Sequence, residues 1–281
     1  MLKDITIGQF FPGNSAIHKL DPRTKILFTL LYIVFLFLIR NYISLILLSA
    51  FVFLMILTAR IPLSTVGKSI RPLTVILIFT AVLQLFTNRE GDPLWRPFPE
   101  KDLMITSDGV AAAVFLVIRI LALVVSSSLL TYTTSPTVLT DAIEKLLSPL
   151  RLFHIKVQAL AMMMTIAIRF IPTLVEETQI IMNAQRARGA RFEQGSVRER
   201  LHALVSVFVP LFVSAFRRAA ELAVAMESRC YTDGSSRTRL REMRFSLRDA
   251  AALLISLCLF GGAVYLSFFP PVSSILFNKV I

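Results

Sequence analysis

Long apolar runs without charge are the feature that most constrains this chain. Residues 26–39 contain no charged side chain, nor do residues 42–59, and both runs consist mostly of Leu, Ile, Phe and Val. Such runs are typical of helices that cross a lipid bilayer. The first run has only 14 residues, but Lys25 and Arg40 at its two ends can reach the headgroups and lengthen it. We therefore expect an integral membrane protein.

The same pattern recurs along the chain and predicts an all-α membrane protein with about five transmembrane helices. These helices are expected over residues 24–42, 43–59, 70–87, 110–132 and 250–269. Between the second and the third, Ile61-Pro62 begins a short amphipathic stretch, in which proline suits the first helical turn.

The distribution of Lys and Arg predicts the orientation. Residues 1–25 and 60–71 are basic, whereas the loop over residues 88–109 offsets its three cations with acidic residues. Because short basic loops stay in the cytoplasm, the N-terminus is expected there. Five spans then divide the chain into three parts. Residues 1–132 form the N-terminal tail and the first four helices, residues 133–249 form a cytoplasmic coupling-helix domain, and residues 250–281 form the last helix and its tail.

The predicted cytoplasmic part holds 17 of the 30 Lys and Arg residues and contains two long helices. The first is expected over residues 157–188, and Gly189 follows it where a left-handed cap would lie. Ser196 and Glu199 have the spacing of a capping box, which predicts that a second helix begins there and continues to about Arg229. Each would be roughly 45–50 Å long, which exceeds the thickness of a bilayer core.

The two long helices resemble each other in sequence. Phe170-Ile-Pro-Thr-Leu-Val175 is similar to Phe208-Val-Pro-Leu-Phe-Val213, and Pro172 and Pro210 are expected to kink their helices about midway. Both helices then end in a small residue, an arginine and another small residue. These triplets are Ala187-Arg188-Gly189 and Ser228-Arg229-Cys230.

The sequence lacks the patterns of an enzyme. It has no HExxH, no Cys/His metal spacing and no Gly-rich phosphate loop. We therefore expect neither catalysis nor a metal or cofactor in this chain, and any dependence on ATP must come from another chain. The net charge of +12 would suggest nucleic acid for a soluble protein, but the 55% hydrophobic content favours anionic lipids or an acidic protein partner instead.

Arg119 is the one charged residue near the middle of a predicted span, and such residues are candidates for a functional site. It would be the polar site of a self-sufficient secondary carrier or channel, which is the main alternative function. The simpler interpretation is that Arg119 ties its helix to the cytoplasmic helices or extends toward an interface.

Arg188 and Arg229 are the candidate docking residues. A guanidinium presents a planar fork of donors that pairs with a carboxylate through two hydrogen bonds, so each arginine could bind an acidic groove on another protein. A simpler role is also open, because a cation complements the negative end of a helix.

The chain resembles the transmembrane T component of energy-coupling factor transporters, the vitamin and metal importers of prokaryotes. The resemblance is closer to the group that serves several substrate-binding subunits. It is carried, in order along the chain, by Leu20-Asp-Pro-Arg-Thr-Lys25, Arg169-Phe-Ile-Pro-Thr-Leu-Val-Glu-Glu177, Gln185-Arg-Ala-Arg-Gly189, Val209-Pro-Leu-Phe-Val-Ser-Ala-Phe216 and Glu221-Leu-Ala-Val-Ala-Met-Glu-Ser-Arg-Cys-Tyr231.

The resemblance implies a multi-pass protein of the prokaryotic cell membrane that couples ATP hydrolysis to import. Arg188 and Arg229 would each dock one of two ABC-type ATPase subunits, which bind the ATP and Mg²⁺. The long helices would cradle an exchangeable, membrane-embedded S component that holds the substrate. The second triplet departs from the family at two residues, because Ser228 and Cys230 stand where the usual motif has Ala and Gly. Cys adopts a left-handed cap less easily than Gly.

Overall fold

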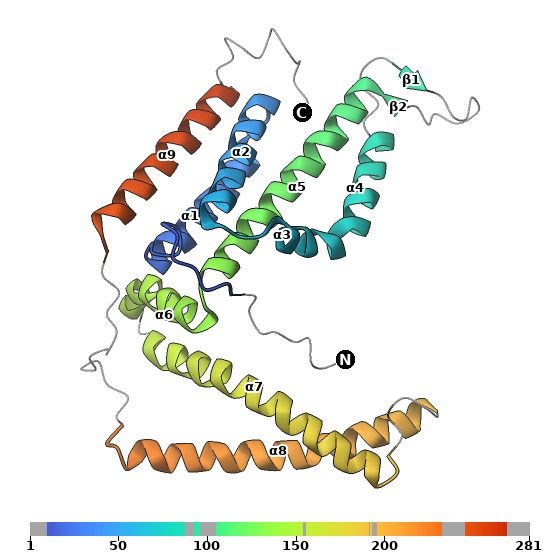
Figure 1. The fold of residues 1–281 in the computed structure, drawn as a ribbon, viewed down its shortest axis with the longest axis vertical. Coiled ribbons are helices and arrows are strands. Elements are labelled where there is room, and N and C mark those ends of the chain that lie inside the picture. Colours follow the sequence, from blue (N-terminus) through green and yellow to red (C-terminus); the bar gives the residue numbers. More distant parts are fainter. Residues whose placement is uncertain are drawn as a thin grey trace. The chain divides into compact units, whose positions relative to one another are not determined.

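The computed structural model describes residues 10–87, 93–95, 105–153, 156–190, 192, 196–231 and 245–268, and most of them lie in helices (Figure 1). Two compact units can be separated. We call residues 8–139 with 243–281 the bundle unit, and residues 1–7 with 140–242 the long-helix unit. The elements are, in order, α1 (Pro22–Leu38), α2 (Tyr42–Ala59), α3 (Leu63–Ile70), η1 (Arg71–Leu73), α4 (Thr74–Thr87), β1 (Pro93–Trp95), β2 (Ile105–Thr106), α5 (Ser107–Thr133), α6 (Pro136–Leu146), η2 (Ser148–Phe153), α7 (Val157–Ala187), α8 (Val197–Glu227) and α9 (Leu247–Phe268).

The predicted all-α membrane fold is confirmed. A helix bonds all of its central backbone groups internally, which is what a lipid environment requires. Within the described ranges, six helical stretches are long and apolar enough to cross a membrane, namely α2, α3 with α4, α5, α7, α8 and α9. With 17 residues, α1 is shorter than these. Because α7 and α8 also meet the requirement of length and composition, their expected place in the cytoplasm stays a prediction.

The core of the bundle unit is a cluster of aromatic rings around Phe260 of α9. Its ring centroid lies 5.5 Å from that of Phe28, 5.6 Å from Tyr32 and 5.8 Å from Phe35, all on α1. Phe51 of α2 is 5.7 Å away on another side. Tilted and edge-on ring pairs add about 0.5–1.5 kcal/mol each to the burial of the rings. This cluster fixes α9 beside α1 and α2 (Figure 1).

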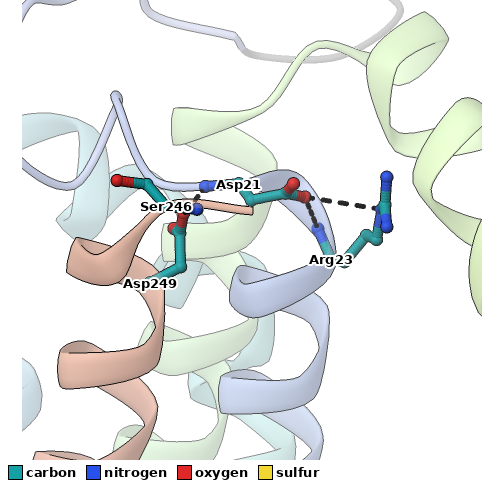
Figure 2. A network of polar contacts seen from close by, with 4 residues as sticks. All are labelled: Asp21, Arg23, Ser246 and Asp249. Atoms are coloured by element: carbon teal, nitrogen blue, oxygen red, sulfur yellow. Dashed lines mark hydrogen bonds and ion pairs between the residues drawn. The ribbon is translucent and has the colours of Figure 1, made fainter. Parts of the chain in front are cut away.

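Polar contacts hold both ends of α9 in the bundle unit. Toward its C-terminal end, the Ala263 carbonyl accepts a hydrogen bond of 2.7 Å from Ser44 Oγ. At its N-terminal end, Asp249 Oδ2 accepts the Ser246 N–H at 2.9 Å, and Oδ1 accepts the Asp21 N–H at 2.7 Å (Figure 2). The Asp249 carboxylate therefore caps its own helix and joins it to the residue before α1.

The first turn of α1 is a meeting point for three parts of the bundle unit. Asp21 caps α1 by accepting the Arg23 N–H at 2.9 Å, with proline at the first helical position (Figure 2). The buried Lys25 Nζ donates to the Thr133 carbonyl at 2.9 Å and to Thr134 Oγ1 at 3.3 Å, at the end of α5. A third bond, of 3.2 Å, goes to the His18 carbonyl. Lys25 thus holds the end of α5 beside α1, and Asp21 holds the beginning of α9 there.

Two features of the fold were not predicted. An antiparallel pair, β1 with β2, lies in the region that we expected to be only a loop. The connection from α5 to α7 contains α6 and η2, for which we predicted no structure.

Candidate docking site at the ends of the long helices

The end of α7 is a left-handed cap that follows directly on Arg188. Gly189 has a φ of 88°, and its N–H donates to the Arg186 carbonyl at 2.9 Å. The Ala190 N–H returns to the Gln185 carbonyl, also at 2.9 Å. These two bonds are those of the Schellman motif. A Cβ at Gly189 would meet no atom within 4 Å, so glycine is favoured here by the backbone angle and not by lack of space.

The end of α8 repeats this geometry around Arg229. Cys230 has a φ of 54°, its N–H donates to the Glu227 carbonyl at 2.9 Å, and the Tyr231 N–H returns to the Met226 carbonyl at 3.0 Å. Cys therefore does take the left-handed position that Gly takes in α7. Its Cβ makes that conformation less favourable by roughly 1 kcal/mol.

Both arginines are presented to the surroundings. All six residues of the two triplets are exposed, from Ala187 to Gly189 and from Ser228 to Cys230. In the part of the chain that the structure describes, neither guanidinium forms an ion pair or hydrogen bond with another side chain. Each triplet therefore offers an unpaired planar fork of donors on a defined backbone, which can accept a carboxylate from a partner.

Polar contacts join α7 and α8, which cross in Figure 1. The Glu177 carboxylate accepts a hydrogen bond from Ser214 Oγ, and its other oxygen lies 3.0 Å from Arg218 Nη2. Nearer the end of α7, Gln185 Nε2 donates to the Ser206 carbonyl at 3.3 Å. Later residues of α7 thus meet earlier residues of α8, so the two helices run in opposite directions.

This antiparallel arrangement keeps the two docking residues apart. The end of α7 lies beside Ser206, and α8 continues from there for 23 positions to Arg229. At 1.5 Å per residue this is about 35 Å. Arg188 and Arg229 therefore form two separate sites of the same local geometry.

Pro172 and Pro210 both lie inside helices of 31 residues that continue past them. Each proline lacks an N–H and so leaves the carbonyl four residues earlier without its helical donor. The kinks expected at the two prolines stay predictions.

Arg119 lies in α5 and contacts the end of α1. Its Nη2 donates to the Ile39 carbonyl, and its guanidinium carbon lies 4.6 Å from the centre of the Phe115 ring. Ile39 is the residue that follows the last turn of α1, where carbonyls have no helical donor and a cation is favoured. The contacts are those of a tie between α5 and α1.

Sequence reasoning missed Lys25, Asp249 and Gln185 as positioning residues. For Asp249 a signal was present, because Ser246 three positions earlier gives the spacing of a helix cap. We expected Lys25 to reach the headgroups, whereas its ammonium group is buried against the end of α5. For Gln185 there was no signal, since its partner depends on how α7 and α8 cross. In the described ranges, no three His, Cys, Asp or Glu side chains are placed to hold a metal ion.

Comparison with known proteins gives a consistent result. The family model described as CbiQ, cobalt transport protein, matches residues 13–240. The chain is similar to the energy-coupling factor transporter transmembrane protein EcfT of Clostridium kluyveri, with 48% identity over 260 residues, covering 92% of this chain and 95% of the relative. The protein of the same name from Ruminiclostridium cellulolyticum is 46% identical over 249 residues, covering 89% and 92%. That of Acidaminococcus fermentans is 46% identical over 260 residues, covering 92% and 96%.

Proposed function

Because the chain belongs to the family of energy-coupling factor transporter transmembrane proteins, we propose that it is the non-catalytic coupling subunit of an ATP-driven importer of vitamins or other micronutrients. In this proposal it transmits the motion of two ATPase subunits to a membrane-embedded substrate-binding S component. The two arginine-tipped helices, α7 and α8, carry that motion.

The observation that carries the proposal is the repetition of one cap geometry at two separate places. Gly189 and Cys230 are both left-handed, and each follows an exposed arginine. A single helix end with an arginine is common, since cations stabilise helix C-termini. Here two helix ends match, and the second adopts the left-handed conformation although Cys makes it less favourable. Two matching ends fit a partner that is present twice and recognises the same small surface each time.

The exposed side chains of α8 fit a partner that has an apolar surface. Phe208, Phe212 and Phe216 follow at intervals of four residues and are 53%, 59% and 71% exposed. Residues four apart share a face of a helix, so the three rings form an apolar stripe. An apolar stripe that its own unit does not cover marks a contact surface for protein or lipid. We assign this stripe to the S component.

The partners supply the chemistry that this chain lacks. The ATPase subunits bind ATP and Mg²⁺, and acidic residues on them pair with the Arg188 and Arg229 guanidinium groups. The S component holds the substrate and determines which one is carried. The long-helix unit lies in the cytoplasm in this scheme, as the basic residues of the 133–249 segment predict.

Charge reversal at the two caps tests the proposal. We expect Arg188→Glu and Arg229→Glu each to weaken the co-purification of ATPase subunits at least tenfold, and the double variant to abolish it, because a carboxylate would then face a carboxylate. Membrane insertion should be unchanged. Arg198→Glu is the control, since Arg198 is also an exposed arginine, near the other end of α8. Normal ATPase binding by the double variant would show that the arginines do not dock the ATPases.

A further inference from the structure

The carbonyl that Pro210 leaves without a donor is the one that Gln185 binds. A proline at position 210 removes the helical hydrogen bond to the carbonyl of residue 206. Gln185 Nε2, from the other helix, donates to that Ser206 carbonyl at 3.3 Å. Both side chains are half-buried, where an unsatisfied carbonyl is unfavourable. The glutamine thus replaces the donor that the proline cannot supply.

Gln185 is also part of the cap that presents Arg188. Its own backbone carbonyl accepts the Ala190 N–H at 2.9 Å and the Arg188 N–H at 3.1 Å. One residue therefore bonds through its side chain to the interrupted turn of α8 and through its backbone to the cap of α7. A displacement of α8 at Pro210 would move Gln185, and with it the residues that place the Arg188 guanidinium.

A second contact lies on the far side of the proline. Ser206 and Ser214 are four residues before and after Pro210, and both face α7, where Gln185 and Glu177 bind them. The interrupted segment of α8 is therefore attached to α7 at both of its ends. A bend at Pro210 changes the angle between these two attachments.

From these contacts we propose that Gln185 is a positioning residue that links the conformation of α8 at Pro210 to the position of Arg188 on α7. The inference rests on the proposed function where it concerns ATPase docking, but the tether itself does not. The arrangement allows the two docking sites to respond to each other: a partner that bends α8 through Arg229 would shift the cap of α7 through the Gln185 amide.

A double-mutant cycle on the full chain in lipid nanodiscs tests the tether without any partner. Gln185→Met keeps the length of the side chain and removes the donor, while Pro210→Ala restores the helical N–H to the Ser206 carbonyl. We expect Gln185→Met to speed amide hydrogen exchange at Gly189 and Ala190 about fivefold, the effect of losing one hydrogen bond of average strength. In the Pro210→Ala background the same change should have less than a twofold effect, because α8 then supplies its own donor.

Gln179→Met is the matched control, since Gln179 is a half-buried glutamine of the same helix with no side-chain hydrogen bond to another described residue. It should leave exchange at Gly189 and Ala190 unchanged. An equal effect of Gln185→Met with and without Pro210, or no effect in either background, would overturn the tether.

ATPase binding separates this inference from the proposed function. We expect Gln185→Met to weaken ATPase co-purification several-fold, less than Arg188→Glu does. If Arg188→Glu weakens binding and Gln185→Met does not, the positioning role is wrong and the docking role stands. If Arg188→Glu has no effect while the exchange cycle is non-additive, the tether stands and the docking role of Arg188 is wrong.

Discussion

Cys230 shows how one residue can keep a shape that its side chain opposes. Its φ of 54° lies in the left-handed region, where a Cβ is unfavourable, and yet the hydrogen bonds of its cap match those around Gly189. The backbone N–H and C=O groups of the cap need hydrogen-bond partners at each helix end. Forming these hydrogen bonds outweighs the unfavourable backbone angle of one residue.

Exchanging the two residues should therefore have opposite effects. We expect Cys230→Gly to slow hydrogen exchange at Tyr231 about fivefold, because it removes a conformational cost of roughly 1 kcal/mol. Gly189→Cys should speed exchange at Ala190 by a similar factor, and no steric clash complicates it, since a Cβ there meets no atom within 4 Å. Exchange that changes in the same direction in both variants would argue against matching caps.

Among the elements, the long helices were the easiest to predict and their contacts the hardest. The helix expected from residue 157 to about 188 is α7, and α8 begins at the capping box of Ser196 and Glu199. Both could be predicted because the signals for a helix and its ends are local in the sequence. The five apolar stretches correspond to α1, α2, α4, α5 and α9 within a few residues. The α6 helix was missed although its sequence is amphipathic, with Leu139, Ile143 and Leu146 four and three positions apart on one face.

Contacts between residues that are far apart in the sequence could not be predicted from any sequence pattern. Asp249 binds the backbone of Asp21 across 228 positions, and Gln185 finds the Ser206 carbonyl only because α7 and α8 cross at that level. At the candidate site, both arginines could be predicted from the repeated triplets, because the repeat is visible in the sequence. The left-handed backbone angle of Cys230 could not be predicted, because it depends on the energy of the whole cap.

The attachment of α9 should depend on Asp249. Asp249→Ala leaves the buried Asp21 N–H and Ser246 N–H without an acceptor, and we expect a loss of about 2 kcal/mol or more in unfolding free energy. Denaturant titration of the purified protein would measure it. Asp108→Ala is the control, because Asp108 also lies in the first turn of a helix but is exposed, and should cost less than 1 kcal/mol. Similar losses for the two variants would mean that the Asp249 contacts add nothing.

For the whole molecule, the side of the membrane on which α7 and α8 lie is the main question. Both are apolar enough to cross a bilayer, but the basic residues of the segment predict that both stay in the cytoplasm. If α8 crossed the membrane, positions 187 and 230 would lie on opposite sides. If both helices are cytoplasmic, the two positions lie on the same side.

Labelling with a membrane-impermeant maleimide distinguishes these topologies. One variant keeps Cys230 alone, through Cys258→Ser, and another carries Ala187→Cys with both native cysteines changed to Ser. We expect both thiols to react in inverted membrane vesicles and neither in right-side-out vesicles. Arg40→Cys, in the predicted outer hairpin of the cysteine-free chain, should react in the opposite way. Reaction of positions 187 and 230 from opposite sides would refute the cytoplasmic placement.

The docking of α9 also has a consequence for how the chain is made. Phe260 fills the centre of a ring cluster whose other members belong to α1 and α2, more than 200 positions earlier. During synthesis, α1 and α2 emerge first and must wait with an open face until the whole long-helix unit has been translated. Contacts of such high sequence separation form slowly, because a long loop has to close first. The bundle of this protein is thus completed only after α9 has emerged from the ribosome, and until then its unfilled aromatic face is open to misassembly.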